Sequence, residues 1–290
     1  MDFLRPGSWP EALAAKAERP DAAPLAGGTD LMVEINFDRR RREALLDLNP
    51  VGELAEWAPD GDELVLGATL PYTRVIAELG EKLPGLAMAA RTIGSPQIRN
   101  RASIGGNLGS ASPAGDCHPV LLALDATVEV ASVRGSRRIA VEEFYLGPKR
   151  SALAPDELIR AVRIPSGAGP CQFAKVGTRN AMVIAVCSFA IALHPPGDSE
   201  GSVRTGIGSA APTPVRAPDA EAFLAGELSG RWESRGALPD GVTARFGELV
   251  AAAAAPIDDL RGTARYRRHA LAVLARRTLG WAWQEYAACA

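Results

Sequence analysis

Two glycine pairs carry the residues whose types and spacing could bind a diphosphate. The first pair lies in Ala26-Gly27-Gly28-Thr29-Asp30, and the second lies in Ser103-Ile104-Gly105-Gly106-Asn107. Because glycine has no Cβ, the backbone can approach a phosphate closely and direct its N–H groups at the oxygens. Thr29 and Asn107, which follow the pairs, can each add a side-chain donor. A single Gly-Gly pair is usually a turn, but two pairs that are each followed by a polar residue indicate two loops around one diphosphate.

Charged residues flank the second pair in the stretch RNRASIGGNLGSASPAGD, residues 99–116. Arg99 and Arg101 could give positive charge to an anion site, although they could equally be surface residues. Asp116 has the wrong sign for a phosphate, but a carboxylate can accept hydrogen bonds from ribose or ribityl hydroxyls. No G-x-x-x-x-G-K-[ST] motif is present, which excludes a P-loop. The residues alone therefore predict a dinucleotide-like diphosphate ligand without P-loop geometry.

One pattern resembles a dinucleotide-binding turn but lacks its context. Residues 206–211 fit G-x-G-x-x-A, yet Pro212 and Pro214 follow at once. Alternate prolines favour extended backbone, whereas the Rossmann turn must open a helix. We therefore expect no dinucleotide site there.

Two further patterns are interpreted as surface features. Residues 197–201 fit the G-x-S-x-G nucleophile elbow, but Pro195-Pro196 precede them and a predicted strand follows. The elbow requires a strand before it and a helix after it, so we expect a hairpin loop with Ser199 in solvent. The four arginines at 39–42 are typical of a charged surface.

Composition limits the class of protein. The chain has 290 residues, of which 47% are hydrophobic and 23% charged, and its net charge of −2 gives no basic field for nucleic acid. No apolar run reaches the roughly 18 residues of a membrane span, and the N-terminal MDFLRPGSWPEAL lacks the apolar core of a signal peptide. These features predict a cytoplasmic protein of about two domains.

The cysteines and histidines give no metal-binding pattern. Cys117, Cys171, Cys187 and Cys289 are scattered with no C-x-x-C spacing, and the three histidines are isolated. Zinc sites and iron–sulfur clusters need close groups of thiolates or imidazoles. We therefore expect no metal bound by this chain alone.

Helical and β-branched segments alternate along the chain, which predicts an α+β fold. Residues 9–17 predict a helix with Ser8 as its N-cap and Pro10 in its first turn. Other expected elements are strands within 23–32 and 44–49, a helical turn at 53–57, a strand entering a helix across 63–80, a helix and a strand pair across 119–144, strands at 181–194 and 203–217, and helices from about residue 218. A break rich in small residues at 166–172 predicts two domains: a larger α/β-type region at 1–168, divided at about 1–52 and 53–168, and a C-terminal domain at 169–290 with an antiparallel sheet and helices.

Several stretches resemble the FAD-binding (medium) subunit of the molybdenum hydroxylases, the family of xanthine dehydrogenase, carbon monoxide dehydrogenase and related bacterial hydroxylases. The strongest likeness lies in PLAGGTDLM (24–32), TIGSPQIRNRASIGGNLGSASPAGD (92–116) and LLALDATVEV (121–130). It continues through FYLGPKRSALAPDELIRAVRIP (144–165), FAKVGTRNAMVIAV (173–186) and DDLRGTARYRRHALAVLARRTL (258–279). The resemblance thus covers nearly the whole chain, and the second glycine motif is specific for the family.

The resemblance implies a fold and a set of site residues. The fold would be a two-subdomain FAD-binding domain of the vanillyl-alcohol-oxidase-like (PCMH) type followed by a smaller α+β domain. Two segments would hold the FAD diphosphate, largely through backbone N–H groups: Pro24, Leu25, Ala26, Gly27, Gly28, Thr29, Asp30 and Leu31, and Ser103, Ile104, Gly105, Gly106 and Asn107.

Four further residues are implied to contact FAD. Asp116 would bind the adenosine part or the sugar-like chain, Ile159 would line the pocket, and Lys175 would reach the flavin. Ile93 stands where animal xanthine oxidoreductases place an aromatic residue, which leaves the packing on the flavin ring open. Cys117 and His118 also depart from the family pattern, and we do not interpret them as a catalytic pair.

The implied role is electron transfer, with no catalytic acid or base on this chain. In the family, a molybdopterin-binding large subunit hydroxylates the substrate, and a small subunit with two [2Fe–2S] clusters carries electrons to FAD, which reduces NAD+, oxygen or another acceptor. Partners would be these two subunits, with neither nucleic acid nor a membrane span involved.

Two alternatives stay open from the sequence. One is a stand-alone FAD oxidase or dehydrogenase acting on a small molecule, with Tyr145, Lys149 and Lys175 as its candidate titratable groups. The other is a protein that kept the fold and lost the flavin, against which the two intact glycine loops argue. The C-terminal LGWAWQEYAACA is either a docking patch or helix core.

Overall fold

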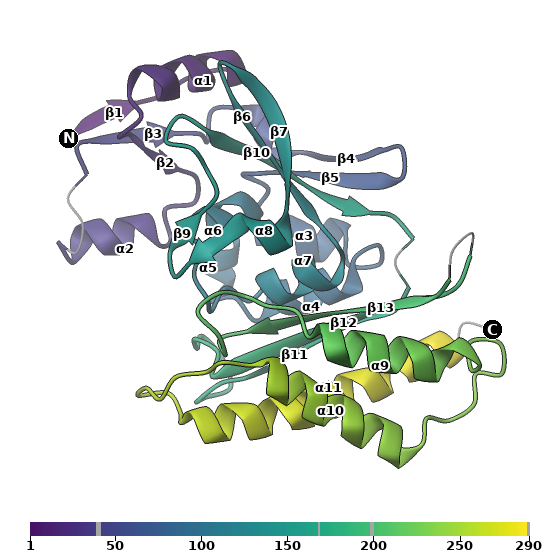
Figure 1. Ribbon diagram of the computed structural model, residues 1–290. Coiled ribbons are helices and arrows are strands. Elements are labelled where there is room, and N and C mark those ends of the chain that lie inside the picture. Colours follow the sequence, from purple (N-terminus) through teal and green to yellow (C-terminus); the bar gives the residue numbers. More distant parts are fainter. Residues whose placement is uncertain (39–41, 168, 198–199, 289–290) are drawn as a thin grey trace. The chain divides into compact units, whose positions relative to one another are not determined.

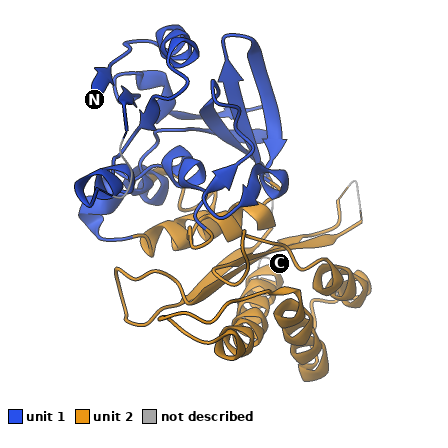
Figure 2. Cartoon of the chain, turned by 60° about the vertical axis from the view of Figure 1, so that its left-hand side comes forward, with its two compact units in different colours: residues 1–77, 94–112, 126–166 blue, residues 78–93, 113–125, 167–290 orange. Residues whose placement is uncertain are grey.

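The computed structural model describes residues 1–38, 42–167, 169–197 and 200–288, and Figure 1 follows the chain through them. The chain forms two compact units, and each unit is discontinuous in sequence (Figure 2). Unit 1 comprises residues 1–77, 94–112 and 126–166, and unit 2 comprises residues 78–93, 113–125 and 167–290. The C-terminal residues thus share a compact unit with two short segments from the first half of the chain. Residue 168, the boundary expected from the sequence, lies outside the described residues.

A three-stranded parallel sheet in unit 1 leads into the first glycine loop. Across the sheet the strands are β1 (Asp2–Leu4), β3 (Ala44–Asp47) and β2 (Ala23–Leu25). Helix α1 (Trp9–Glu18) packs against this sheet, with Trp9 and Ala12 in the same buried cluster as Leu46. The Ser8 hydroxyl accepts a hydrogen bond from the Glu11 N–H at 3.4 Å. The expected N-capped helix is therefore confirmed.

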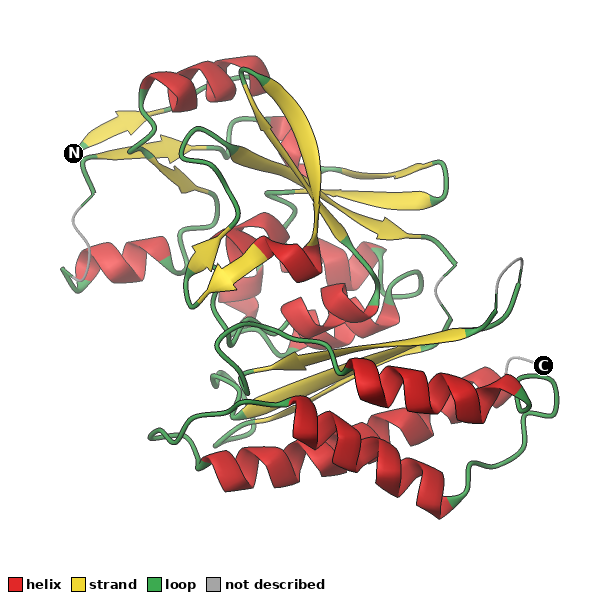
Figure 3. Cartoon of the chain, viewed as in Figure 1, coloured by secondary structure: helices red, strands yellow, loops and turns green. Residues whose placement is uncertain are grey.

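Unit 1 also contains a five-stranded antiparallel sheet (Figure 3). Its order is β4 (Trp57–Asp60), β5 (Glu63–Gly67), β10 (Leu158–Pro165), β6 (Thr127–Ser132) and β7 (Gly135–Ala140). The remaining elements are α2 (Leu31–Asn36), the 3-10 helix η1 (Gly52–Ala55), most of α3 (Tyr72–Glu78), α5 (Pro96–Arg99), α6 (Ile104–Ser110), α8 (Val141–Phe144) and the hairpin β8 (Tyr145–Gly147) and β9 (Arg150–Ser151). The expected helical turn at 53–57 is wrong at its end, because Trp57 pairs with Leu66 as the first residue of β4.

Unit 2 has three layers, with an antiparallel sheet between helices (Figure 1). The strands in order are β11 (Cys171–Val176), β12 (Cys187–His194) and β13 (Ser202–Gly208). Helices α4 (Pro84–Arg91) and α7 (His118–Ala123) cover one face of the sheet. Helices α9 (Pro218–Ser229), α10 (Asp240–Ala253) and α11 (Ala264–Ala288) cover the other face.

Successive side chains of β12 point to opposite faces of the sheet, and each set includes buried apolar side chains, which explains why helices cover both faces. Phe189, Ile191 and Leu193 join the buried cluster under α9, α10 and α11, and the residues between them face the other way. The strand begins at Cys187 rather than at Ala181 as expected from the sequence. The apolar residues before it form a loop, because Met182 has a left-handed φ of 51° that a strand cannot contain.

The C-terminal helix supplies both core and exposed aromatic side chains. Trp283 is 4% exposed and its ring lies 5.7 Å from that of Trp232, whereas Trp281 is 45% exposed. The helix-core interpretation therefore holds for Trp283 but not for Trp281. Within the described part of the chain, no helix combines the length and the apolar character needed to cross a membrane.

The pattern at residues 206–211 does not open a helix, as expected. Gly206 and Gly208 lie in β13, where α7 packs against the strand. A Cβ on Gly206 would lie 2.0 Å from the carbonyl oxygen of Pro119. Gly206 therefore allows α7 to pack closely against the sheet. Ser199 and Arg39 to Arg41, which carry the other two patterns, lie outside the described residues, and Arg42 pairs with Glu34 at 3.5 Å.

We expect Gly206→Ala to destabilise the protein by about 1–3 kcal/mol, because the added methyl group would overlap the Pro119 carbonyl. Gly226→Ala in α9 is the matched control, since a Cβ there meets no atom within 4 Å. Alanine favours a helix interior, so this control should gain about 0.5–1 kcal/mol. Urea unfolding followed by tryptophan fluorescence measures both. A Gly206→Ala protein as stable as wild type would show that α7 does not need this close approach.

Candidate functional site

The first glycine loop of unit 1 connects β2 to α2. Gly28 has φ +73°, and its carbonyl accepts a hydrogen bond from the Met32 N–H at 3.0 Å. A Cβ on Gly27 would lie 1.9 Å from the Arg101 carbonyl oxygen. Arg101 stands just before the second glycine motif. The structure therefore brings the two motifs together by direct backbone contact, and only glycine permits this contact at position 27.

Asn49 strengthens this contact, and sequence reasoning missed it. Its Nδ2 donates to the Ala26 carbonyl at 2.9 Å, and its Oδ1 accepts from Arg101 Nη2 at 3.3 Å. Asn49 follows the carboxyl end of β3, a parallel strand, which is where such sheets usually place ligand-binding residues. Its position after the ALLD strand was the signal that could have identified it.

The backbone of the first loop is a set of unused donors. Among the described residues, the N–H groups of Gly27, Gly28, Thr29 and Asp30 have no hydrogen-bond acceptor. Around them, Leu25, Ala26, Thr29 and Leu31 are half-buried, and Pro24 and Asp30 are exposed. Exposed or half-buried N–H groups without acceptors are typical of a loop that binds an anion.

The second motif differs, because the backbone N–H groups of residues 104–107 are already occupied. The Ser103 hydroxyl caps α6 by accepting from the Gly106 N–H at 3.1 Å, and the Gly105 N–H donates to the Ala68 carbonyl at 2.9 Å. The N–H groups of Ile104 and Asn107 donate to the Leu70 and Ser103 carbonyls at 3.4 and 3.0 Å. Ile104 is fully buried, Gly106 is exposed and Asn107 is half-buried. The expectation of mainly backbone donors therefore fits the first loop better than the second, which offers side chains.

In unit 2, two other expected residues form a buried ion pair. Lys175 Nζ donates to Asp116 Oδ2 at 2.6 Å, and the side chains are 7% and 8% exposed. Lys175 Nζ also lies 3.3 Å from the Thr92 carbonyl, and Thr92 Oγ1 lies 3.1 Å from Asp116 Oδ2. Lys175 comes from β11, and Thr92 ends α4. Thr92 is a second residue that sequence reasoning missed.

Asp116 keeps one oxygen without a partner. Its Oδ1 is buried and accepts no hydrogen bond from the described residues. Burial raises the pKa of Asp116, and the Lys175 charge, the hydrogen bond from Lys175 and that from Thr92 oppose this rise. A buried acceptor without a donor is costly, so this oxygen is suited to a ligand hydroxyl or amino group.

The residues around Asp116 hold it in place. A Cβ on Gly115 would lie 2.3 Å from His118 Cε1, so the imidazole packs directly on the backbone before Asp116. The backbone N–H of His118 donates to the Gly115 carbonyl at 3.3 Å, and both Cys117 and His118 are fully buried. These contacts give His118 a structural role as the start of α7.

Two of the remaining expected residues neighbour these groups, because Ile159 lies beside α6, which the second motif opens, and Ile93 directly follows Thr92. Ile159, on β10 in unit 1, is 8% exposed and lies beside Gly109 of α6. Ile93, in unit 2, is half-buried, and its N–H donates to the Ala90 carbonyl. Of the groups considered for a stand-alone enzyme, Tyr145 is buried and Lys149 forms an ion pair with Glu34 at 2.8 Å.

Each unit offers groups that suit one kind of ligand. Among the described residues, the N–H groups of the glycine loop in unit 1 have no acceptor, which suits a diphosphate. In unit 2, Asp116 Oδ1 has no donor among the described residues, which suits a ligand hydroxyl or amino group. No group of three or more His, Cys, Asp or Glu residues in the described segments is arranged to hold a metal ion.

Two family models match the chain. Residues 1–167 match the FAD binding domain in molybdopterin dehydrogenase, and residues 172–282 match the CO dehydrogenase flavoprotein C-terminal domain. The chain is 32% identical over 283 residues to the nicotine 6-hydroxylase medium subunit of Paenarthrobacter nicotinovorans, covering 96% of this chain and 95% of that protein. It is 31% identical over 285 residues to the carbon monoxide dehydrogenase medium chain of Afipia carboxidovorans, covering 96% and 95%.

A solved structure agrees with these relatives. A chain of CO dehydrogenase from Oligotropha carboxidovorans superposes with a TM-score of 0.89 at 30% identity, covering 98% of both chains. The family resemblance, the α+β fold and FAD as the cofactor are thereby confirmed. This chain belongs to the FAD-binding medium subunits of the molybdenum hydroxylases, the oxidoreductase family of carbon monoxide dehydrogenase and xanthine dehydrogenase.

Proposed function

We propose that this chain is the electron-transfer subunit of its hydroxylase, passing electrons from iron–sulfur clusters on a small subunit to NAD+ or another acceptor. A molybdopterin-binding large subunit would hydroxylate the substrate, and the small subunit would carry two [2Fe–2S] clusters. The observation that carries the proposal is the first glycine loop, whose N–H groups have no acceptor among the described residues and which rests on a backbone contact that only Gly27 permits. Bound FAD would supply the redox chemistry, which the protein tunes through charge and access.

In unit 1, the diphosphate would be held by two kinds of donor. The backbone N–H groups of residues 27–30 would bind phosphate oxygens, with the Thr29 hydroxyl beside them. The Ser103 hydroxyl and the Asn107 amide would contribute from the second motif. Pro24, Leu25, Ala26 and Leu31 would shape the loop, and Ile104 and Gly105 would anchor α6 in the core. Arg101 would add positive charge close to the loop.

In unit 2, we assign the buried ion pair to the non-phosphate part of the cofactor. Asp116 would accept a hydrogen bond at Oδ1 from a hydroxyl or amino group of FAD, while Lys175 and Thr92 hold Oδ2 in place. Lys175 would reach the flavin while its ammonium group stays paired with Asp116. Ile93 and Ile159 would contribute apolar contacts. We also propose that the boundary between the FAD-binding domain and the C-terminal domain lies near residue 168.

The assignment of the whole protein is tested by purifying the tagged chain from its native host and recording its visible absorption spectrum. We expect flavin bands overlaid with iron–sulfur absorption from co-purifying partner subunits. Flavin bands without any partner chain would instead favour a stand-alone flavoenzyme. A colourless chain that also fails to take up added FAD would contradict both functions.

We expect Gly27→Ala to lower FAD affinity at least about tenfold, since the methyl group would push the first loop away from Arg101. FAD content per chain, from absorbance of the purified protein, and the Kd of re-added FAD measure the loss. Thr29→Val leaves the backbone unchanged and should weaken FAD binding by several-fold, because one hydrogen-bond donor is lost.

Gly52→Ala is the control for the glycine variant, because a Cβ at Gly52 meets no atom within 4 Å. It should bind FAD as wild type does. If Gly27→Ala and Thr29→Val both retain wild-type affinity, the first loop does not hold the cofactor.

We expect Lys175→Met to destabilise the protein by about 3 kcal/mol at pH 8, because it leaves the Asp116 carboxylate buried without a cation. The pKa of Asp116 is already raised by burial, so the folded state binds this proton more tightly than the unfolded chain. The loss should therefore be small below about pH 4, where both states are protonated, and should grow as pH rises. Urea unfolding at several pH values measures this dependence.

The double variant Asp116→Asn with Lys175→Met separates stability from binding. It removes both buried charges, so it should recover part of the stability while binding FAD more weakly than wild type. Arg245→Met breaks an exposed pair with Glu248 and should change stability by less than about 1 kcal/mol at any pH. A double variant with wild-type FAD affinity would remove Asp116 and Lys175 from the cofactor site.

A further inference from the structure

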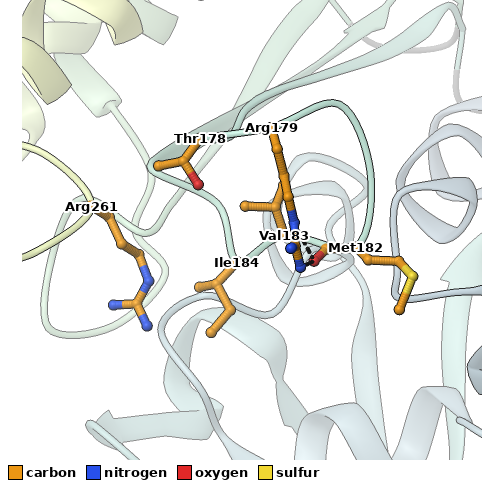
Figure 4. Close-up of a pocket in the computed structure, with 6 residues that line it drawn as sticks. All are labelled: Thr178, Arg179, Met182, Val183, Ile184 and Arg261. Atoms are coloured by element: carbon orange, nitrogen blue, oxygen red, sulfur yellow. Dashed lines mark hydrogen bonds between the residues drawn. The ribbon is translucent and has the colours of Figure 1, made fainter.

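The two arginines of a groove in unit 2 form hydrogen bonds within their own loops. The groove has a volume of about 360 Å³ and is lined by Thr178, Arg179, Met182, Val183, Ile184 and Arg261 (Figure 4). Arg179 donates to the Met182 carbonyl, and Arg261 pairs with Asp259 at 3.2 Å. Within the described residues these contacts hold single loops, in contrast to a lysine of unit 1 that links distant segments.

This lysine is Lys149, which forms an ion pair with Glu34 across 115 positions of the chain. Lys149 Nζ lies 2.8 Å from Glu34 Oε1, and the two side chains are 61% and 21% exposed. The other carboxylate oxygen of Glu34 lies 3.5 Å from Arg42 Nη2. Glu34 belongs to α2, the helix that directly follows the first glycine loop. Charge therefore holds α2 at Glu34.

Helix α2 depends on such a link because none of its residues is buried. Met32 and Val33 are 37% and 46% exposed, and Phe37 at its end is 70% exposed. The Met32 N–H donates to the Gly28 carbonyl at 3.0 Å, so the first turn of the helix is continuous with the glycine loop. Packing usually supplies most of the stability of a helix in a protein. Contacts that fix α2 in place of packing therefore also fix the N–H groups of the loop.

The backbone of Lys149 is fixed on a different helix. Its N–H donates to the carbonyl of Ala111 at 3.0 Å, and Ala111 is the C-cap of α6, which the second glycine motif opens. Both residues have a left-handed backbone, with φ of 56° at Lys149 and 43° at Ala111. This conformation costs energy in residues other than glycine and persists only where the surrounding structure enforces it. Lys149 thus connects the two helices that follow the two glycine motifs.

We propose that Lys149 is a positioning residue for the cofactor, which holds the first glycine loop in the arrangement that binds the FAD diphosphate. It acts through Glu34 and does not itself contact FAD. The ion pair ties α2 to α6 and adds to the contact between Gly27 and Arg101, which joins the same two motifs. FAD leaves when the loop moves away from the phosphates, so a less firmly held α2 releases it faster. The inference rests on the proposed function, because it requires FAD at the first loop.

The test measures the rate of FAD release from the purified holoprotein. The holoprotein is diluted at low and at high NaCl, and free FAD is followed by its fluorescence. We expect Lys149→Met to speed release about three- to fivefold at low salt, as loss of one partly exposed ion pair allows. The difference from wild type should shrink at high salt, because salt screens the pair. Lys149→Arg keeps the charge and should release FAD as slowly as wild type.

Glu34→Gln separates positioning from direct binding. If Lys149 acts through Glu34, this variant speeds release at least as much as Lys149→Met, because it also loses the pair with Arg42. Adding Lys149→Met to it should then change nothing further. If Lys149 instead bound a phosphate, Glu34→Gln would remove a nearby negative charge and slow release, which would overturn the proposal.

Lys149→Gly separates positioning from stability. Glycine adopts a φ of 56° without strain, so this variant should unfold at a higher urea concentration than Lys149→Met. It should nevertheless release FAD as fast as Lys149→Met, because both lack the ammonium group. Release rates that instead followed stability across the variants would give Lys149 a purely structural role and contradict the proposal.

Arg134→Met is the matched control. Arg134 and Asp156 form an ion pair in unit 1 at 2.6 Å with similar exposure, 65% and 16%, but Arg134 lies in the turn between β6 and β7. This variant should release FAD as wild type does. Wild-type release rates in both Lys149→Met and Glu34→Gln, with FAD bound to every variant, would overturn the positioning role alone. A wild-type chain that neither contains FAD nor takes it up would overturn the proposed function, and the positioning role with it.

Discussion

The absence of a side chain at Gly27 is the constraint on which the candidate site of unit 1 depends. It lets the loop after β2 lie on the carbonyl of Arg101, so that two motifs distant in sequence form one surface. Asn49 then bridges the same two segments with hydrogen bonds to Ala26 and Arg101. The N–H groups of the first loop, which have no acceptor within the described part of the chain, lie on this support and are available as donors without any rearrangement of the core. Fixed donors of this kind bind an anion with little loss of conformational entropy.

Arg267 and Lys175 are two buried cations of unit 2, and their ion pairs differ in one respect. Arg267 is paired with Asp259 and also donates to the Val186 carbonyl, and Asp259 in turn accepts hydrogen bonds from its own loop. Lys175 is paired with Asp116, yet Asp116 keeps a buried oxygen without a donor. Burying an ion pair is costly unless its remaining hydrogen bonds are made. Among the described residues the first pair therefore has its hydrogen bonds made, whereas the second leaves one carboxylate oxygen open for the ligand that we propose.

Local patterns in the sequence determined much of this structure. The Ser8 cap, the glycine loops and the rejection of a dinucleotide turn at 206–211 each depend on a few neighbouring residues, so they could be predicted. The extended start of the 181–194 segment was predicted wrongly, because an apolar run does not reveal the left-handed backbone at Met182. Asn49 reaches Arg101 across 52 positions, and Lys175 reaches Thr92 across 83. Such contacts depend on how strands and helices pack, and so do the hydrogen bonds of Arg267 to Val186 and Asp259. The sequence by itself thus determined which residues could bind a flavin dinucleotide, and only the tertiary structure decided which donors are free to do so, because hydrogen bonds made in folding had already used the rest.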